Sequence, residues 1–219
     1  MPAKKPDLSY PGDDAVRRVL VRYRCPTPFH VVRMRLWGEI VRPSLGASPV
    51  KTIVSLWPDG MPIFTNADEA NGFFQALMSL WNRMAKFQGG SPPLKLQKVG
   101  HIDTREALRE AANLRAEELR DGFMKGFTGG NRHIDVPPGV SDLLIRVEKG
   151  IELLATARNT LARPPGPDDD AILAELTKVF PVVDRATQSD LNAIAIACKE
   201  WRKTEVQAMR DTAQKGAPN

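Results

Sequence analysis

The chain has 219 residues, of which 42% are hydrophobic and 26% are charged, as in an ordinary globular protein. This length can bury one core, and no apolar run reaches about 18 residues, so no membrane span is expected. The first residues lack the apolar core of a signal peptide, and the two cysteines, Cys25 and Cys198, suggest no disulfide framework. We therefore expect a cytoplasmic protein whose thiols are reduced.

The formal charge of +5 is concentrated near the start of the chain. Residues 17–42 contain seven arginines and a single acidic residue, Glu39, and so carry +6 by themselves. Clustered arginines indicate a surface for nucleic acid or for an acidic partner. The seven are Arg17, Arg18, Arg22, Arg24, Arg33, Arg35 and Arg42.

The first two predicted helices flank a proline-rich turn. The first spans about residues 13–24 and ends before Pro26, because proline cannot continue the helical hydrogen bonds. Thr27 is the predicted N-cap of the second helix, which has Pro28 at its first position and runs to about Val41. Two short helices joined in this way are compatible with a helix-turn-helix motif. The large apolar residues of the second helix favour a core helix instead.

A short predicted helix at about 48–57 precedes a strongly amphipathic one at about 67–87. Thr65 and Asn66 are competing N-caps of the longer helix, because each is followed three residues later by an acid. At helical spacing the apolar side chains fall within an arc of about 160°, and the alternation of a strand is absent. These side chains are Ala70, Phe73, Phe74, Leu77, Met78, Leu80, Trp81, Met84 and Ala85.

The next predicted helix spans about residues 104–127, with Asp103 as its N-cap. Gly122 and Gly126 lie one turn apart beside its apolar stripe. A glycine in a helix interior costs about 1 kcal/mol relative to alanine, so two of them require a reason. We predict that a neighbouring helix packs closely against the backbone at these two glycines.

The helical pattern resumes after Pro138 and is interrupted again at the linker and at Pro181, which we expect to separate a short helix from a long one. The long C-terminal helix is expected to turn Leu191, Ile194, Ala197, Cys198 and Trp201 toward the core. The predicted organisation is a flexible N-terminus at 1–12, a helical core domain at 13–162, a linker at 163–170, a C-terminal helical hairpin or appendage at 171–213 and a frayed tail at 214–219.

Three short packing patterns stand out between residues 56 and 126. They are Leu56-Trp57 followed by Pro62-Ile63-Phe64 and 68–71, the aromatic-asparagine helix at 77–85, and the Gly-Phe pair with a second glycine at 119–126. Together they resemble the YgfB/YecA-like family of bacterial all-α proteins over about residues 32–162. The resemblance implies an irregular bundle of seven to eight helices. Some members carry a C-terminal cysteine-rich zinc motif, which this chain lacks.

No combination of residues predicts catalysis or a bound cofactor. A structural zinc site needs four ligands, usually as two close pairs, and the cysteines and histidines are too scattered to supply them. A Cys25/His30 dyad is the one candidate for an activated thiol, although a buried, inert cysteine is the favoured interpretation. The sequence also lacks a nucleophile elbow and a phosphate-binding loop. We therefore expect a protein that is not an enzyme and holds neither metal nor cofactor.

The favoured hypothesis is an all-α protein that acts through protein–protein contacts as a regulator or adaptor. Its partner is another protein, with a homodimer as one alternative. The second hypothesis is nucleic-acid binding by the arginine-rich face of the first two helices, whose arginines would contact phosphates. The same arginines are instead neutralised if they pair with acids such as Glu117, Glu118 and Asp121.

Overall fold

The computed structural model describes residues 9–89, 92–131 and 134–215, and every regular element in these ranges is helical. The all-α fold class is thereby confirmed. The elements are α1 (Asp13–Arg22), α2 (Phe29–Val41), α3 (Pro49–Val54), α4 (Ala67–Ala85), α5 (Arg105–Glu117), the π-helical η1 (Glu118–Met124), α6 (Lys125–Thr128), α7 (Val140–Ala162) and α8 (Asp169–Lys215). Among these helices none is long and apolar enough to cross a membrane.

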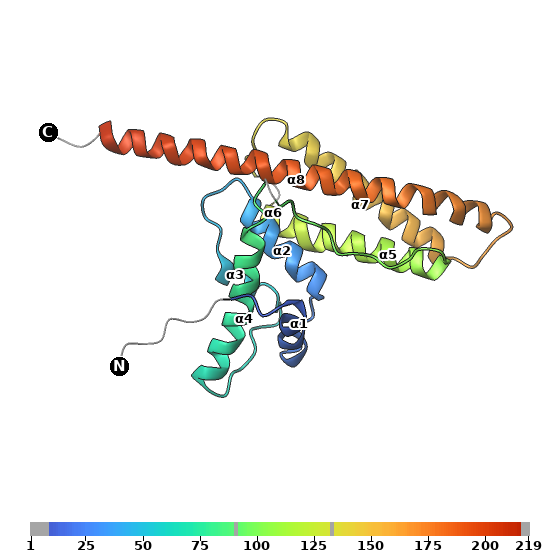
Figure 1. Ribbon diagram of the computed structural model, residues 1–219, viewed down its shortest axis with the longest axis horizontal. Helices are drawn as coiled ribbons and strands as arrows, with labels where there is room; N and C mark the ends of the chain where they lie inside the picture. The colour runs from blue at the N-terminus through green and yellow to red at the C-terminus, as the bar shows by residue number, and fades with distance from the viewer. Residues whose placement is uncertain (1–8, 90–91, 132–133, 216–219) are drawn as a thin grey trace.

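The helices form two groups on either side of α2 (Figure 1). α5, α7 and α8 run along the long axis of the molecule, whereas α1, α3 and α4 form a lobe on the opposite side of α2. One continuous apolar core joins both groups and includes Val16 of α1, Leu80 of α4, Leu154 of α7 and Leu191 of α8. The C-terminal end of α8 projects beyond the other helices.

α2 is the central helix of this core. Ten of its thirteen residues are buried, and it packs against α4, η1, α6 and α8. The Trp37 side chain is fully buried, and its indole N–H donates a hydrogen bond to the carbonyl of Phe87 (3.0 Å). Such burial stabilises the fold through both apolar area and a satisfied polar group. It leaves α2 no open face that would fit a DNA groove.

Three glycines allow α2 to approach η1 and α6 at backbone distance. A Cβ added to Gly122 would lie 2.6 Å from the Cβ of Met34, and one added to Gly126 would overlap the backbone of Arg35. A Cβ added to Gly38 of α2 would lie 2.5 Å from the carbonyl oxygen of Phe123. α2 is therefore the neighbouring helix whose close approach the first two glycines predicted. Gly38, on the opposite helix, was not anticipated.

Two predicted helix starts are wrong by one residue. Thr27 does not cap α2, because its hydroxyl donates to the carbonyl of Leu56 (3.3 Å) and Pro28 occupies the N-cap position. Thr104 rather than Asp103 caps α5, and its hydroxyl oxygen accepts from the N–H of Ala107 (3.1 Å). At α2 the tertiary hydrogen bond takes the hydroxyl away from the cap position, and at α5 the cap falls on the second of two neighbouring residues that both favour capping.

Both predicted N-cap residues of α4 form hydrogen bonds with its first turn. Asn66 is the N-cap, and its side-chain oxygen accepts from the N–H of Glu69 (2.9 Å). The Glu69 carboxylate turns back to accept from the N–H and the hydroxyl of Thr65 (2.8 and 2.6 Å). The first turn of α4 thus has a reciprocal cap, extended by one residue beyond the usual capping box.

The predicted break at Pro181 is wrong, because α8 continues through this proline from Asp169 to Lys215. A proline in a helix interior costs about 3 kcal/mol, since one hydrogen bond is lost. Burial of Phe180 and of Leu191 further along the same helix offsets this cost. The segment from 171 to 213 is therefore part of one helix rather than a hairpin, and its residues from Phe180 to Cys198 contribute to the common core.

The remaining predicted boundaries shift slightly. α1 ends at Arg22 instead of Arg24, whose φ of 48° is incompatible with a continuing helix. The expected linker at 163–170 gives way to α8 at Asp169. α8 also extends two residues into the tail that was expected to fray, and residues 1–8 and 216–219 of the predicted ends lie outside the described residues.

An extended segment, residues 94–97, lies against α8 and is held by side-chain amides. The N–H of Leu94 donates to Asn192 (3.0 Å), and the Asn192 amide donates back to the Leu94 carbonyl (3.2 Å). Gln188, one turn earlier on α8, accepts from the N–H of Leu96 (3.1 Å). Both leucines are buried. Amide side chains thus satisfy backbone groups that a neighbouring strand would satisfy in a sheet.

Candidate partner-binding cleft

The arginines of α2 are tied to the interior of the molecule. Arg33 donates to the carbonyl of Lys95 (2.6 Å) and pairs with Glu118 (3.3 Å). Arg35 donates twice to the carbonyl of Asp121 (3.0 and 3.1 Å). Burial lowers the pKa of Arg35. These contacts make the two guanidinium groups structural and remove them from the predicted cationic face.

The arginines of α1 point outward but are partly neutralised. Arg17 lies 4.2 Å from the ring centre of Phe29, and its guanidinium is 4.0 Å from Asp14. Arg22 pairs with Glu69 (3.2 Å). Among the seven arginines, Arg18 and Arg24 are those whose side chains have no hydrogen-bond or ion-pair partner within the described ranges. The predicted arginine-rich face is therefore divided: the arginines of α2 are held by internal contacts, whereas those in and just after α1 point toward solvent.

A buried charge network joins η1 to α5, α2 and α8. The Glu118 side chain is fully buried and accepts hydrogen bonds from Arg33 (3.3 Å) and from the N–H of Gln97 (3.0 Å). Arg115, also buried, pairs with both Glu118 and Asp184. Buried charges require partners of this kind, and removal of one partner is strongly destabilising. The network fixes η1 in place but exposes no reactive group.

Both cysteines are shielded by the fold, and His30 is paired with an acid. Burial raises the pKa of the Cys25 thiol and raises that of Cys198 to about 12, which opposes thiolate formation. The ring of His30 is held by Glu117 through Nε2 and Oε2 (3.2 Å). In the part of the chain that the structure describes, no three His, Cys, Asp or Glu side chains are grouped as metal ligands, and His133 lies outside it.

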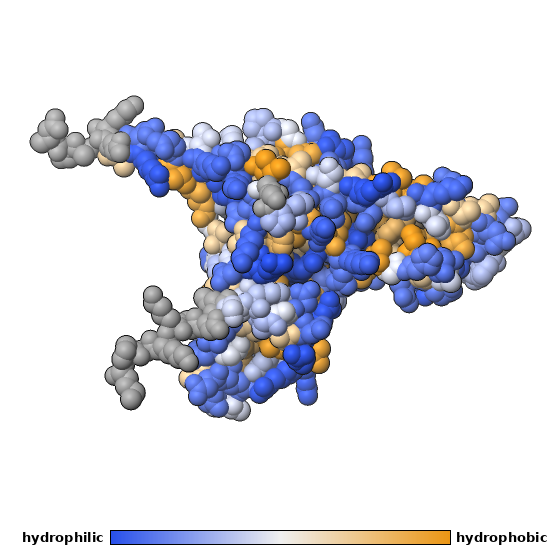
Figure 2. Space-filling view, viewed as in Figure 1, coloured by the Kyte–Doolittle hydropathy of each residue, from blue (hydrophilic) through white to orange (hydrophobic). Residues whose placement is uncertain are grey.

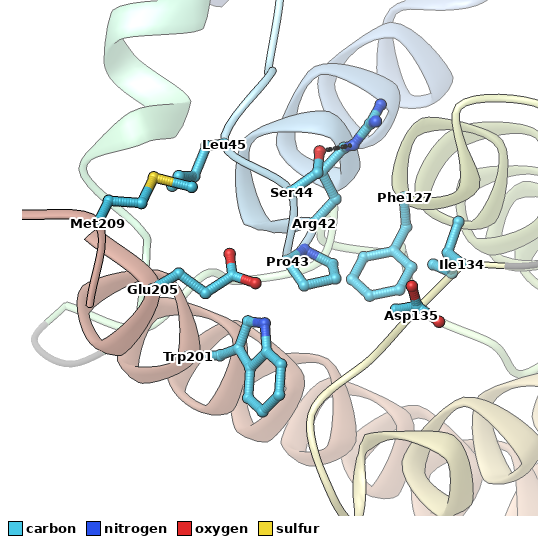
Figure 3. A pocket seen from close by; sticks show the side chains of 10 residues that line it. All are labelled: Arg42, Pro43, Ser44, Leu45, Phe127, Ile134, Asp135, Trp201, Glu205 and Met209. Carbon is cyan, nitrogen blue, oxygen red and sulfur yellow. Dashed lines mark hydrogen bonds between the residues drawn. The ribbon is translucent and has the colours of Figure 1, made fainter. Parts of the chain in front are cut away.

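A cleft of about 340 Å³ lies beneath the projecting end of α8 (Figure 3). Trp201, Glu205 and Met209 face it from successive turns of α8, because residues four apart share one side of a helix. Residues 42–45, which follow α2, form the facing wall, and Phe127 with residues 134–135 lines the rest. The cleft thus brings together three segments that are distant in the sequence.

Apolar side chains line this cleft without being covered. Leu45, Trp201 and Met209 are 46%, 36% and 60% exposed, respectively. Trp201 was expected to face the core but is partly exposed at the rim of the cleft. The neighbouring Arg202 holds α8 against the end of α2 by donating to the carbonyl of Val41 (2.8 Å). Figure 2 shows apolar side chains gathered beneath the projecting end of α8. Clustered exposure of this kind is typical of an interaction site.

The cleft also carries two carboxylates that lack a cation. Glu205 and Asp135 have no ion-pair partner among the residues that the structure describes. Arg42 also lines the cleft, but its guanidinium is bound to Glu39 (2.9 Å) and Ser44 (2.7 Å). In Figure 3 the Glu205 carboxylate points into the cleft, whereas the Arg42 guanidinium is turned away toward Ser44.

No protein-family model, curated protein or solved structure matches this chain. The resemblance to the YgfB/YecA-like family accordingly stays a prediction. It rests on packing patterns, which describe how helices meet and say little of what their surfaces bind. The functional proposal for this protein therefore depends on the geometry of its own surface.

Proposed function

We propose that the protein acts by binding a segment of another protein in the cleft beneath the projecting end of α8. In this proposal it is a regulator or adaptor rather than an enzyme. The observation that carries the proposal is the shared exposure of Leu45, Trp201 and Met209 around one cleft. A partner that covers them would gain roughly 25 cal/mol for each Å² of apolar area removed from water.

The projecting end of α8 supports this role. Most side chains from Lys203 to Ala213 are exposed, so this part of the helix has little packing of its own. A helix end without tertiary contacts is marginally stable, because most helical stability in proteins comes from packing of an apolar face. A partner helix laid along Trp201 and Met209 supplies that packing and uses a recurring mode of recognition.

The test is affinity capture from host cells with a cleft variant and a matched surface variant. Leu45→Ser/Met209→Ser removes apolar groups from the cleft, whereas Val21→Ser/Ile63→Ser removes apolar groups that are even more exposed from outside it. We expect one protein to be captured by the wild type and by the control, to survive nuclease treatment, and to be lost with the cleft variant. Identical capture by all three proteins would overturn the proposal.

Nucleic-acid binding is a second candidate function, favoured by the outward position of Arg18, Arg22 and Arg24 around the end of α1. Phosphate contacts by these side chains give affinity that falls steeply with salt. Fluorescence anisotropy with duplex DNA and single-stranded RNA at low salt tests it. Weaker binding by Arg18→Ala/Arg24→Ala than by the exposed control Arg163→Ala supports this function, and no binding by the wild type removes it.

A further inference from the structure

We infer that the segment bound in the cleft beneath α8 presents an arginine or lysine side chain next to an apolar one. This inference rests on the proposed function and specifies the chemistry of the partner. It starts from a local reversal of charge. The chain carries +5 overall, whereas the cleft contains two carboxylates, Glu205 and Asp135, that form no ion pair with any other described residue.

The position of Glu205 favours a cation in the cleft. Glu205 lies one helical turn beyond Trp201, and its carboxylate points between the indole and Pro43 (Figure 3). A guanidinium or ammonium group placed there meets a carboxylate and an exposed aromatic face together. Ion pairing and the attraction of a cation to a ring reinforce each other when the group is partly desolvated.

The apolar lining fits the rest of such a side chain. Lysine and arginine bury their methylene stems along apolar surface while the charged head stays near water. Pro43 and Met209 offer that surface on opposite walls of the cleft, and Leu45 extends it toward the outside. A neighbouring apolar residue of the partner would cover Leu45 and Met209, which are about half exposed or more.

Among the described residues that line the cleft, none places a cation beside Glu205. Arg42 is held by Glu39 and Ser44 and is turned away from Glu205 (Figure 3). An acidic partner would meet like charges at Glu205 and Asp135, which disfavours it. The charge of the lining therefore selects a basic and apolar segment of another protein.

The experiment uses a library of short random peptides displayed on phage. The library is first depleted on Leu45→Ser/Met209→Ser protein and then selected on the wild type. We expect enriched peptides to carry an arginine or lysine beside an apolar residue. Replacing arginine by citrulline, or lysine by acetyl-lysine, should weaken binding about tenfold, because shape is kept and charge is lost. Isothermal titration and the Trp201 indole resonance, assigned with Trp201→Phe, measure this loss.

Glu205→Gln/Asp135→Asn is the decisive variant. Neither side chain forms an ion pair within the part of the chain that the structure describes, so we expect an unchanged melting temperature and loss of the tenfold preference for charge. Peptides that depend on Leu45 and Met209 but tolerate citrulline would overturn the inference and leave the proposed function standing. Failure to enrich any cleft-dependent peptide would overturn both. Self-association of the purified protein that disappears in the Leu45→Ser/Met209→Ser variant would assign the cleft to a second copy and overturn the inference.

Discussion

Gly126 of α6 lies directly against the backbone of Arg35 in α2, so closely that a methyl group on the glycine would overlap the arginine's carbonyl oxygen. This contact, together with the one between Gly122 and Met34, sets the distance between α2 and the η1–α6 segment. Backbone atoms cannot move aside as the end of a flexible side chain can. The distance between α2 and the η1–α6 segment therefore depends on Gly122 and Gly126 having no side chain.

Gly126→Ala is expected to destabilise the protein by about 1–3 kcal/mol or more, because overpacking outweighs the better helix propensity of alanine. Gly72→Ala is the matched control, since an added Cβ at this exposed position of α4 meets no atom within 4 Å. The control should raise the free energy of unfolding by up to about 1 kcal/mol. Urea denaturation followed by circular dichroism measures both changes. A neutral Gly126→Ala variant would contradict the close approach.

Glu118→Ala is expected to cost about 3–5 kcal/mol, because it leaves the buried guanidinium of Arg115 and the partly buried one of Arg33 without their shared carboxylate. Glu152→Ala, an exposed change on α7, should stay within about 0.5 kcal/mol of the wild type. The same denaturation measurement compares them. Equal stability of the two variants would mean that the network contributes nothing to the fold.

Glu69 should make stability depend on pH in the acid range. Hydrogen bonds from the side chain and backbone of Thr65 and from Tyr23 lower the pKa of Glu69 from 4.5 to about 2. A carboxylate with a lowered folded-state pKa contributes stability fully above pH 4.5, and this contribution is lost as the pH falls toward 2.

The melting temperatures of wild type and Glu69→Gln should therefore differ most above pH 4.5 and converge as the pH falls toward 2. Asp68→Asn, a change to the adjacent exposed acid, should keep the wild-type dependence on pH. Parallel melting curves of wild type and Glu69→Gln across this range would contradict the role of these hydrogen bonds.

Pro181→Ala should stabilise α8 by about 1–3 kcal/mol, because alanine restores the N–H that proline lacks in a helix interior. The proline side chain is exposed, so little packing is lost with it. Arg185 donates to the carbonyl of residue 181 (3.1 Å), and this contact to the backbone survives the substitution. Thermal denaturation provides the measurement, and a lower melting temperature would show that the pyrrolidine ring itself supports the helix.

Local patterns in the sequence predicted most helices and the tight glycine contact, because periodicity and caps depend on neighbouring residues. They failed at Pro181, where packing along α8 outweighs a local penalty. They left open whether Arg33 and Arg35 face a partner or pair within the fold. In the structure Arg33 pairs with Glu118, one of the acids considered, and Arg35 donates to the carbonyl of Asp121, each more than 80 residues away. Charge counted along a chain says little about which groups pair in space.

The cleft could not be predicted for a related reason. Trp201 occupies a position on the apolar stripe of α8, and helical spacing alone places it with the buried residues. Trp201 is exposed because α8 extends beyond the helices that pack against it. Where this happens depends on the lengths and crossing of those other helices. Leu45 and Asp135 belong to loops whose approach to α8 has no periodic signature.

The clasp between Leu94 and Asn192 has a consequence for how the chain is made. Its two residues are 98 positions apart, and Gln188 holds Leu96 across a similar interval. During synthesis, residues 94–97 leave the ribosome long before α8 exists to receive their backbone groups. The N–H groups of Leu94 and Leu96 can therefore reach these partners only after residues 188–192 have been translated, so this contact forms later than the helices that precede it in the chain.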